Sequence, residues 1–247
     1  MTKVVFTGPT LSAGDAREAL DAVVLPPAAQ GDVYRVASRQ KPAAIGLVDG
    51  YFDTLPAVWH KEILWALREG IAVFGGGSMG ALRAAELAGF GMRGVGDVFE
   101  AFAGGRLEDD DEVALAHETA ERGYRALSEP MVNVRATLAA ATAAGIVGEA
   151  TRAGLVERVK ALFYPDRTYA RMLAEARAAG VIDDEVDRLA AWLPSGRVDV
   201  KRADALSMLR AMRDDAPPAE PPRFHFEETS YWEALRAQED ADLPRRR

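Results

Sequence analysis

The fold is decided by the stretch Ile71-Ala-Val-Phe-Gly-Gly-Gly-Ser78-Met-Gly-Ala-Leu-Arg83-Ala-Ala-Glu86-Leu87. Its apolar start is typical of a buried strand, its glycines of a tight turn and its end of a helix. The frame Gly76–Gly80 reads G-x-S-x-G, which in a strand-to-helix turn exposes a serine hydroxyl. Glycine permits the positive φ and close backbone approach that such a turn needs. The spacing predicts a nucleophile at Ser78, and an ordinary helix cap is the alternative interpretation.

The helix start after Ser78 offers unpaired backbone N–H groups and the positive end of a helix dipole. Both suit an anion or a developing oxyanion, so Gly77 and Met79 are candidate oxyanion or substrate-binding residues. No Asp-then-His pair follows in the usual order of a catalytic triad. The glycines also suit a phosphate, but no Gly-Lys-Ser or Gly-Lys-Thr follows them, so a P-loop is not supported.

Strand and helix patterns alternate along the first ninety residues. Short apolar runs separated by helical segments are typical of β-α-β units and predict a parallel sheet. We expect an α/β fold with a parallel sheet of about four strands and flanking helices, followed by a mostly α-helical second half. The predicted strands span residues 3–7, 22–25, 43–48 and 71–74, and the predicted helices span residues 11–20, 30–38, 55–69 and 79–88.

The pattern changes after these residues. A helix is predicted over 95–102, and an acidic run at 108–112 is expected to lead into a helix through His117 to about Leu127. We expect an α/β core with the site over 1–130, a helical region over 131–213, and a Pro-rich linker with a tail over 214–247.

The composition excludes several classes of protein. The 247 residues carry a net charge of −8 and include no cysteine. An acidic chain does not favour broad binding of nucleic acid, and without cysteine there is no disulfide, thiolate nucleophile or cysteine-ligated metal. No apolar run approaches the roughly 20 residues of a membrane helix, and no signal peptide is recognisable. We expect a cytoplasmic protein that needs no cofactor or metal and binds neither nucleic acid nor membrane.

Three loops are expected to meet at one edge of the sheet. Gly8 follows the first predicted strand, Asp49 and Gly50 follow the third, and the glycines before Ser78 follow the fourth. Sites in parallel sheets form at the carboxyl ends of the strands. Gly8 and Gly50 therefore join the candidate oxyanion donors, and Asp49 is expected either to hold a loop or to orient a base.

Lys61 is the candidate base. It lies in the predicted helix 55–69, for which Asp53 or Thr54 is the expected N-cap, and its helical neighbours are apolar. A lysine kept from water gives up its proton more readily and suits general-base catalysis. A Ser–Lys pair also needs no histidine. The alternative is a lysine whose stem covers core surface while its ammonium reaches solvent.

Four neighbouring polar residues are supporting candidates. His60 is either a second base or a hydrogen-bonded histidine at the edge of the core. Glu62 falls inside the apolar arc of its helix and needs a partner, for which Arg83 or Lys61 is suitable. Arg83 and Glu86 are three residues apart, so they are expected to pair or to orient an anion.

The acidic run with His117 matches no metal-ligand spacing and is better explained by helix capping.

Seven blocks of sequence occur in an order that resembles the TfuA-like family, over roughly residues 4 to 135. Three of them are Ile45-Gly-Leu-Val-Asp-Gly-Tyr-Phe52, Val58-Trp-His-Lys-Glu-Ile-Leu64 and Gly77-Ser-Met-Gly-Ala-Leu-Arg-Ala-Ala-Glu-Leu87. The other four are Phe6–Leu11, Pro26–Asp32, Gly91–Gly96 and Asp110–Val113 with His117.

The resemblance implies a role in peptide backbone thioamidation beside a YcaO enzyme. It implies that the chain supplies sulfur from a small ThiS-like carrier with a C-terminal thiocarboxylate, through a hydrolase-like serine and lysine. Those residues correspond to Ser78 and Lys61. An adaptor that docks YcaO, peptide and carrier without chemistry remains the alternative, and the oligomeric state stays open.

Overall fold

The computed structural model of the chain describes residues 2–52, 55–181, 183–214 and 220–241. The chain divides into two compact units, one formed by Met1–Arg106 with Asp204–Arg247 and the other by Leu107–Ala203. The first unit contains all five strands of the sheet and the second is helical. No described helix combines the length and the apolar character that crossing a membrane requires.

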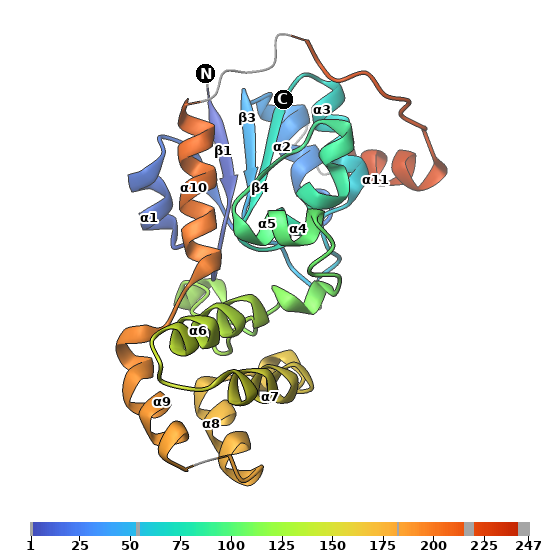
Figure 1. The fold of residues 1–247 in the computed structure, drawn as a ribbon. Helices are drawn as coiled ribbons and strands as arrows, with labels where there is room; N and C mark the ends of the chain where they lie inside the picture. The colour runs from blue at the N-terminus through green and yellow to red at the C-terminus, as the bar shows by residue number, and fades with distance from the viewer. Residues whose placement is uncertain (1, 53–54, 182, 215–219, 242–247) are drawn as a thin grey trace. The chain divides into compact units, whose positions relative to one another are not determined.

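The first unit is built on a five-stranded parallel sheet (Figure 1). The expected α/β class is confirmed, with one more strand than expected, because β5 is too short and too polar to give an apolar run. The strand order β2-β1-β3-β4-β5 reverses direction at β1, so the carboxyl ends of β1 and β3 flank a crevice where α/β sheets bind ligands. The strands are β1 (Lys3–Phe6), β2 (Val23–Leu25), β3 (Ala44–Leu47), β4 (Ala72–Gly76) and β5 (Arg93–Val95).

Helices cover both faces of this sheet, so β3 and β4 are buried along their whole length and β1 is buried after Lys3. Three helices pack on one face: α2 (Asp32–Gln40), α3 (His60–Arg68) and α4 (Met79–Leu87). The other face is covered by α1 (Ala13–Ala19) and by the part of α10 (Val200–Asp214) that belongs to this unit. The unit also contains α5 (Asp97–Ala103) and α11 (Ser230–Ala241).

Helix α3 is shorter than the predicted helix 55–69, because it begins at His60. Residues before it are extended and pair with the loop that precedes α2: Pro56 accepts the N–H of Gln30 at 2.9 Å, and Ala57 forms an antiparallel bridge with Ala29. These long-range bonds replace the helical ones. The expected caps Asp53 and Thr54 lie outside the described residues.

The second unit surrounds an apolar core of its own, which includes Leu138, Leu155 and Leu189. Its helices are α6 (Met131–Ala143), α7 (Glu149–Lys160), α8 (Tyr169–Ala178) and α9 (Asp183–Gly196). The helix predicted through His117 to Leu127 is wrong. This fully described stretch forms short 3-10 turns, and the chain reverses at Gly123 and Tyr124, whose φ angles of 68° and 58° no α-helix accepts.

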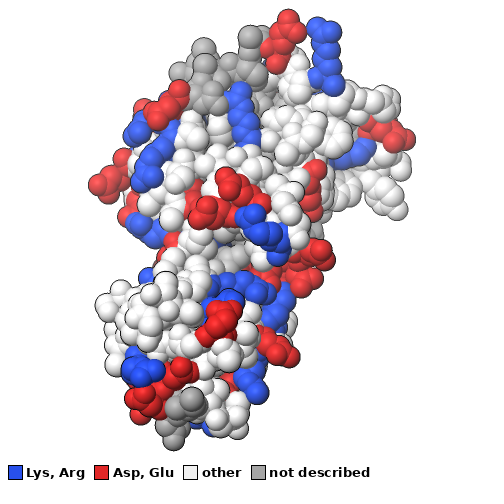
Figure 2. Space-filling model, viewed as in Figure 1, with Lys and Arg blue, Asp and Glu red and all other residues white. Residues whose placement is uncertain are grey.

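Charged side chains of both signs are interspersed on the face shown in Figure 2. Neither lysine and arginine nor aspartate and glutamate forms a continuous stripe there, so the charge of −8 is spread rather than gathered on that face.

Candidate active site

Ser78 lies on the turn between β4 and α4, where it is the N-cap residue of the helix. The positive φ of this turn, 76°, belongs to Gly77, and Ser78 itself has a φ of −129°. Its side chain is buried, with 3% of the residue exposed. The carbonyl of Ser78 accepts the N–H groups of Ala81 and Leu82, which anchors the serine to the first turn of α4.

Two glycines fix the height of this turn above the sheet. A Cβ on Gly80 would lie 1.8 Å from the carbonyl oxygen of Leu47, and one on Gly75 would lie 2.0 Å from the carbonyl oxygen of Gly80. Gly80 also donates its N–H to Val48 at 3.1 Å. Only glycine allows this approach, so the sequence holds Ser78 against the carboxyl ends of β3 and β4.

Several polar groups at this turn are unused. Across residues 2–52, 55–181, 183–214 and 220–241, the hydroxyl of Ser78 has no hydrogen-bond partner. The N–H groups of Gly77, Met79 and Gly50 likewise reach no acceptor in these ranges. Gly50 is adjacent to the turn, since a Cβ built on it would lie 2.9 Å from Cγ of Met79. A nucleophile and backbone donors for an oxyanion are therefore gathered here.

Asp49 organises the loop after β1. Its carboxylate is buried and accepts three hydrogen bonds, from the N–H of Gly8 at 2.8 Å and from the N–H and hydroxyl of Thr10 at 3.0 and 2.6 Å. Asp49 therefore holds this loop against the end of β3. Because the N–H of Gly8 is already used, Gly8 is not an available oxyanion donor in this arrangement. Thr10, which sequence reasoning did not single out, completes the contact.

Lys61 is half-buried near the start of α3 and contacts the C-terminal segment. Its ammonium donates to the carbonyl of Glu227 and, at 3.3 Å, to the hydroxyl of Thr229, and it lies 5.2 Å from the ring centre of Phe226. No local pattern reveals these partners, because they lie more than 160 positions further along the chain.

His60, Arg83 and Glu86 join α3 to α4. His60 Nε2 lies 2.7 Å from Oε2 of Glu86, and Arg83 donates to the same oxygen at 2.8 Å and to the carbonyl of Val58 at 3.2 Å. Burial opposes ionisation of Glu86, but the hydrogen bonds from His60 and Arg83 outweigh it and lower the pKa of the carboxyl. The predicted pairing of Arg83 with Glu86 is confirmed.

The contact of His60 with Glu86 places the start of α3 beside the end of α4, whereas Ser78 lies at the beginning of α4. Glu86 lies eight residues beyond Ser78, a rise of about 12 Å in an α-helix. Lys61, the neighbour of His60, directs its ammonium to Glu227 and Thr229 instead. The structure thus does not bring Ser78 and Lys61 into hydrogen-bond contact, and their catalytic pairing stays a prediction.

Glu62 is fully buried and is held by backbone groups rather than by Arg83 or Lys61. Its two oxygens accept the N–H of Trp59 at 3.0 Å and the N–H of Tyr34 at 3.2 Å, so it ties the starts of α3 and α2 together. Burial raises the pKa of Glu62 to about 7, although these hydrogen bonds act in the opposite direction. Glu62 is a structural carboxyl that titrates near neutrality.

The acidic run forms an ion-pair network in the second unit. Oxygens of Asp109, Asp111 and Glu112 lie within 4.8 Å of one another. Lys160 contacts all three, and Arg167 and Arg135 bind Asp111 and Glu112 at 2.5 and 2.8 Å. Burial opposes ionisation of Asp111, but Arg167 and Lys160 hold its pKa low. His117 turns away to the carbonyl of Glu118 and the ring of Tyr124.

Comparison with known proteins identifies one family. Residues 49–168 match the family model described as TfuA-like protein. This range contains Ser78, Lys61 and the acidic run. Of the seven blocks that carry the resemblance, four lie wholly in this range. Ile45–Phe52 overlaps its start, and Phe6–Leu11 and Pro26–Asp32 precede it. No curated protein matches the chain.

Proposed function

The chain belongs to the TfuA-like family over residues 49–168, and we propose that it hydrolyses a thiocarboxylated ThiS-like sulfur carrier to deliver sulfide. The family is associated with YcaO-dependent thioamidation, so a YcaO enzyme is its partner and is the proposed acceptor of the sulfide. The peptide to be modified reaches the complex through the YcaO enzyme.

Ser78 is the proposed nucleophile. Its hydroxyl oxygen attacks the thiocarboxylate carbonyl as Lys61 takes the proton. Lys61 then gives this proton to the departing sulfur, so that hydrosulfide leaves, an acyl-serine forms and the amine is neutral again. Water then attacks the acyl-serine with Lys61 again as base, which returns the serine and a carrier carboxylate. The N–H groups of Gly77, Met79 and Gly50 are suited to hold the oxyanion of both steps.

The observation that supports this proposal best is the unused chemistry around the β4–α4 turn. Ser78, a residue only 3% exposed whose hydroxyl has no described partner, stands beside three N–H groups without described acceptors. A serine that served only as a helix cap would accept an N–H of the first turn, as Ser12 does from Asp15. Ser78 makes no such bond in the described part of the chain.

The proposal requires Lys61 to leave its present partners. Its bonds to Glu227 and Thr229 join it to the C-terminal segment, which is attached to the rest of the chain by the Pro-rich residues 214–222. Lysine has a long, flexible side chain, and a rearrangement of the loop before α3 would have to bring the amine to Ser78.

The decisive experiment measures sulfide release from a thiocarboxylated carrier. We expect Ser78→Ala to reduce the rate by at least about a thousandfold, as removal of a nucleophile does. Ser12→Ala is the matched control, because Ser12 caps an exposed helix start, and it should keep the full rate. Lys61→Arg should also fail, since arginine keeps the charge but does not act as a base near neutral pH. Undiminished hydrolysis by Ser78→Ala would refute the proposal.

The engagement of Lys61 by the C-terminal segment favours a second candidate, a non-catalytic adaptor that docks YcaO, peptide and carrier. An adaptor needs an intact surface but no nucleophile. If Ser78→Ala and Lys61→Ala both support full thioamidation while the complex still assembles, the adaptor is the correct function.

A further inference from the structure

The C-terminal segment Phe224–Ala241, here called the strap, is packed on the outside of α2 and α3 (Figure 1). Its main anchor is Trp232, which is fully buried. The indole ring lies 5.4 Å from the ring of Tyr34, 6.5 Å from that of Trp65 and 5.5 Å from that of Phe226, the last within the strap itself. One aromatic side chain therefore carries much of the apolar contact of α11.

An ion pair and a hydrogen bond, both to Glu239, hold the far end of the strap. Glu239 is buried and binds Arg35 at 2.7 Å, and its carbonyl accepts a hydrogen bond from Arg39 at 2.7 Å. Its carboxylate occupies the space beside Gly31, where an added Cβ would lie 2.3 Å from Oε1. The surface of α2 therefore fits this acidic end of the strap.

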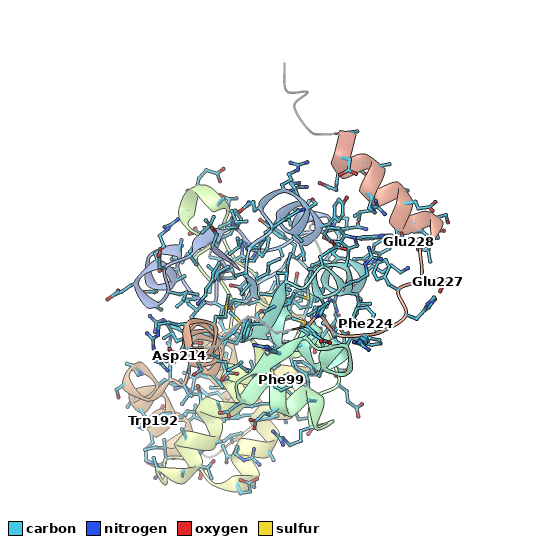
Figure 3. The ribbon with its side chains drawn as sticks, turned by 90° about the horizontal axis from the view of Figure 1, so that it is seen from above. Phe99, Trp192, Asp214, Phe224, Glu227 and Glu228 are labelled. Carbon is cyan, nitrogen blue, oxygen red and sulfur yellow. The ribbon has the colours of Figure 1, made fainter. Side chains whose placement is uncertain are left out.

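The near end of the strap holds Lys61. Figure 3 shows Phe224, Glu227 and Glu228 along the stretch that leads into α11. The carbonyl of Glu227 accepts from the Lys61 ammonium, and Glu228 pairs with Arg68 at 3.3 Å. The ring of Phe226 faces both cations, 5.2 Å from Lys61 Nζ and 4.4 Å from the Arg68 guanidinium. The carbonyl of Glu227, the hydroxyl of Thr229 and the ring of Phe226 together hold the ammonium of the proposed base.

The contact of the strap with α2 and α3 leaves polar atoms without partners, which favours its reversal. Two buried polar atoms have no hydrogen-bond partner in the described residues, and both belong to the strap: Nε1 of Trp232 and Nε of Arg236. Each would gain a partner in water, so docking loses part of what the aromatic contact gains. The strap also follows the run Asp214-Asp-Ala-Pro-Pro-Ala-Glu-Pro-Pro222, whose composition is that of a linker.

We infer that the strap is an autoinhibitory element: when docked it holds the Lys61 ammonium, and its release frees that amine for the rearrangement that brings it to Ser78. This inference rests on the proposed function. A partner that binds the surface of α2 and α3 would displace the strap and so couple sulfide release to assembly of the complex.

Lysine labelling tests the release without any measurement of activity. The chain has five lysines, so acetylation by a water-soluble reagent can be followed at each by mass spectrometry. Lys41 is exposed and serves as the reference. Lys3, whose ammonium donates to the carbonyl of Met212 at 2.6 Å within the same unit as the strap, reports whether that unit is intact. We expect Trp232→Ala to raise labelling of Lys61 at least tenfold. Tyr231→Ala, at a neighbouring residue that is 76% exposed, should leave it unchanged.

A second variant releases the strap without altering its aromatic anchor. Glu239→Lys places a cation against Arg35 and Arg39 and should also raise labelling of Lys61. Glu233→Lys makes the same charge change on the exposed side of α11 and is its control. If labelling of Lys3 stays at the wild-type level and Lys61 is labelled equally in the wild type and both release variants, the strap does not hold Lys61 and the inference is wrong.

Hydrolysis of the thiocarboxylated carrier then separates the inference from the function on which it rests. We expect Trp232→Ala and Glu239→Lys to raise the rate at least tenfold, and Ser78→Ala to abolish it in each background. Unchanged rates with accessible Lys61, while Ser78→Ala remains inactive, would overturn the inference and leave the proposed function standing. Rates that do not depend on Ser78 in any background would overturn the proposed function itself.

Discussion

Helices α3 and α4 follow neighbouring strands and pack on the same face of the sheet, yet different contacts position their first turns. The start of α4 is fixed by its own glycines against the carbonyl of Leu47. The start of α3 is fixed by Glu62, which bonds to Tyr34 of α2, while the strap holds its Lys61. The nucleophile therefore lies on a locally encoded turn, and the proposed base lies on a turn that depends on distant parts of the chain.

This difference suggests a division of labour. A serine held by backbone contacts keeps one geometry, as a nucleophile with its oxyanion donors requires. A lysine held by a separable segment has a position that another molecule can change. Substitutions in the first turn of α4, in the first turn of α3 and in the polar contact between the two helices test this difference.

Gly80→Ala should have the largest effect, because it breaks the local design of α4. The added Cβ would lie 1.8 Å from the carbonyl oxygen of Leu47, which belongs to the central sheet. Neither backbone yields without loss of its hydrogen bonds, so we expect a loss of about 4 kcal/mol or more in the free energy of unfolding, measured in urea.

Gly89→Ala is the matched control for this prediction. Gly89 is exposed just beyond α4, and a Cβ there meets nothing within 4 Å. The stability should change by no more than about 0.5 kcal/mol. Similar losses for both variants would mean that the close approach at Gly80 is not what fixes the start of α4.

Glu62→Gln tests the long-range design of α3 through its pH dependence. The pKa of Glu62 is about 7 in the folded chain, above the ordinary value of 4.5, so the folded state binds the proton more tightly than the unfolded state. Stability from this group is therefore complete below pH 4.5 and is lost as pH rises through 7. The loss amounts to about 3 kcal/mol over that window.

The variant should lack this component, because glutamine does not titrate. The unfolding free energy of the wild type minus that of Glu62→Gln should fall by about 3 kcal/mol between pH 4 and pH 8. Glu69→Gln makes the same change at an exposed carboxylate at the end of the same helix and is the matched control, since a fall of the same size there would not come from the burial of Glu62. A parallel curve for Glu62→Gln would show that the pKa of Glu62 is the same in the folded and unfolded chain, so that burial does not raise it.

The two helix starts also mark how far sequence reasoning reaches. The strands β1, β3 and β4 and the turn at Ser78 were predictable, because apolar runs and glycines act on their immediate neighbours. The three residues of β5, Arg93–Val95, carry no apolar run, and their partner β4 alone makes them a strand. The extended chain before His60 depends on pairing with residues 29 and 30, which outweighs the helical pattern.

The candidate site likewise contains groups that the local sequence positions and groups that distant parts of the chain position. The unused groups at Ser78, Gly77 and Met79 follow from the local turn. The partners of Glu62 and Lys61 do not, because Tyr34 reaches Glu62 from another helix and Thr229 reaches Lys61 across the sequence. A pattern of apolar neighbours predicts that a charged group needs a partner, but not which part of the chain provides it.

His60→Ala should have the smallest effect, and it tests whether polar contacts hold the two helix starts together. His60 and Glu86 are 2.7 Å apart, but their side chains are 43% and 38% exposed, so water screens the pair. We expect a loss below about 1 kcal/mol in the free energy of unfolding, measured in urea. A double-mutant cycle with Glu86→Gln isolates the pair from the other contacts of each side chain. A coupling above about 2 kcal/mol would mean that this bridge, rather than the apolar contacts of α3 and α4 with the sheet, fixes the spacing between the nucleophile's helix and that of its proposed base.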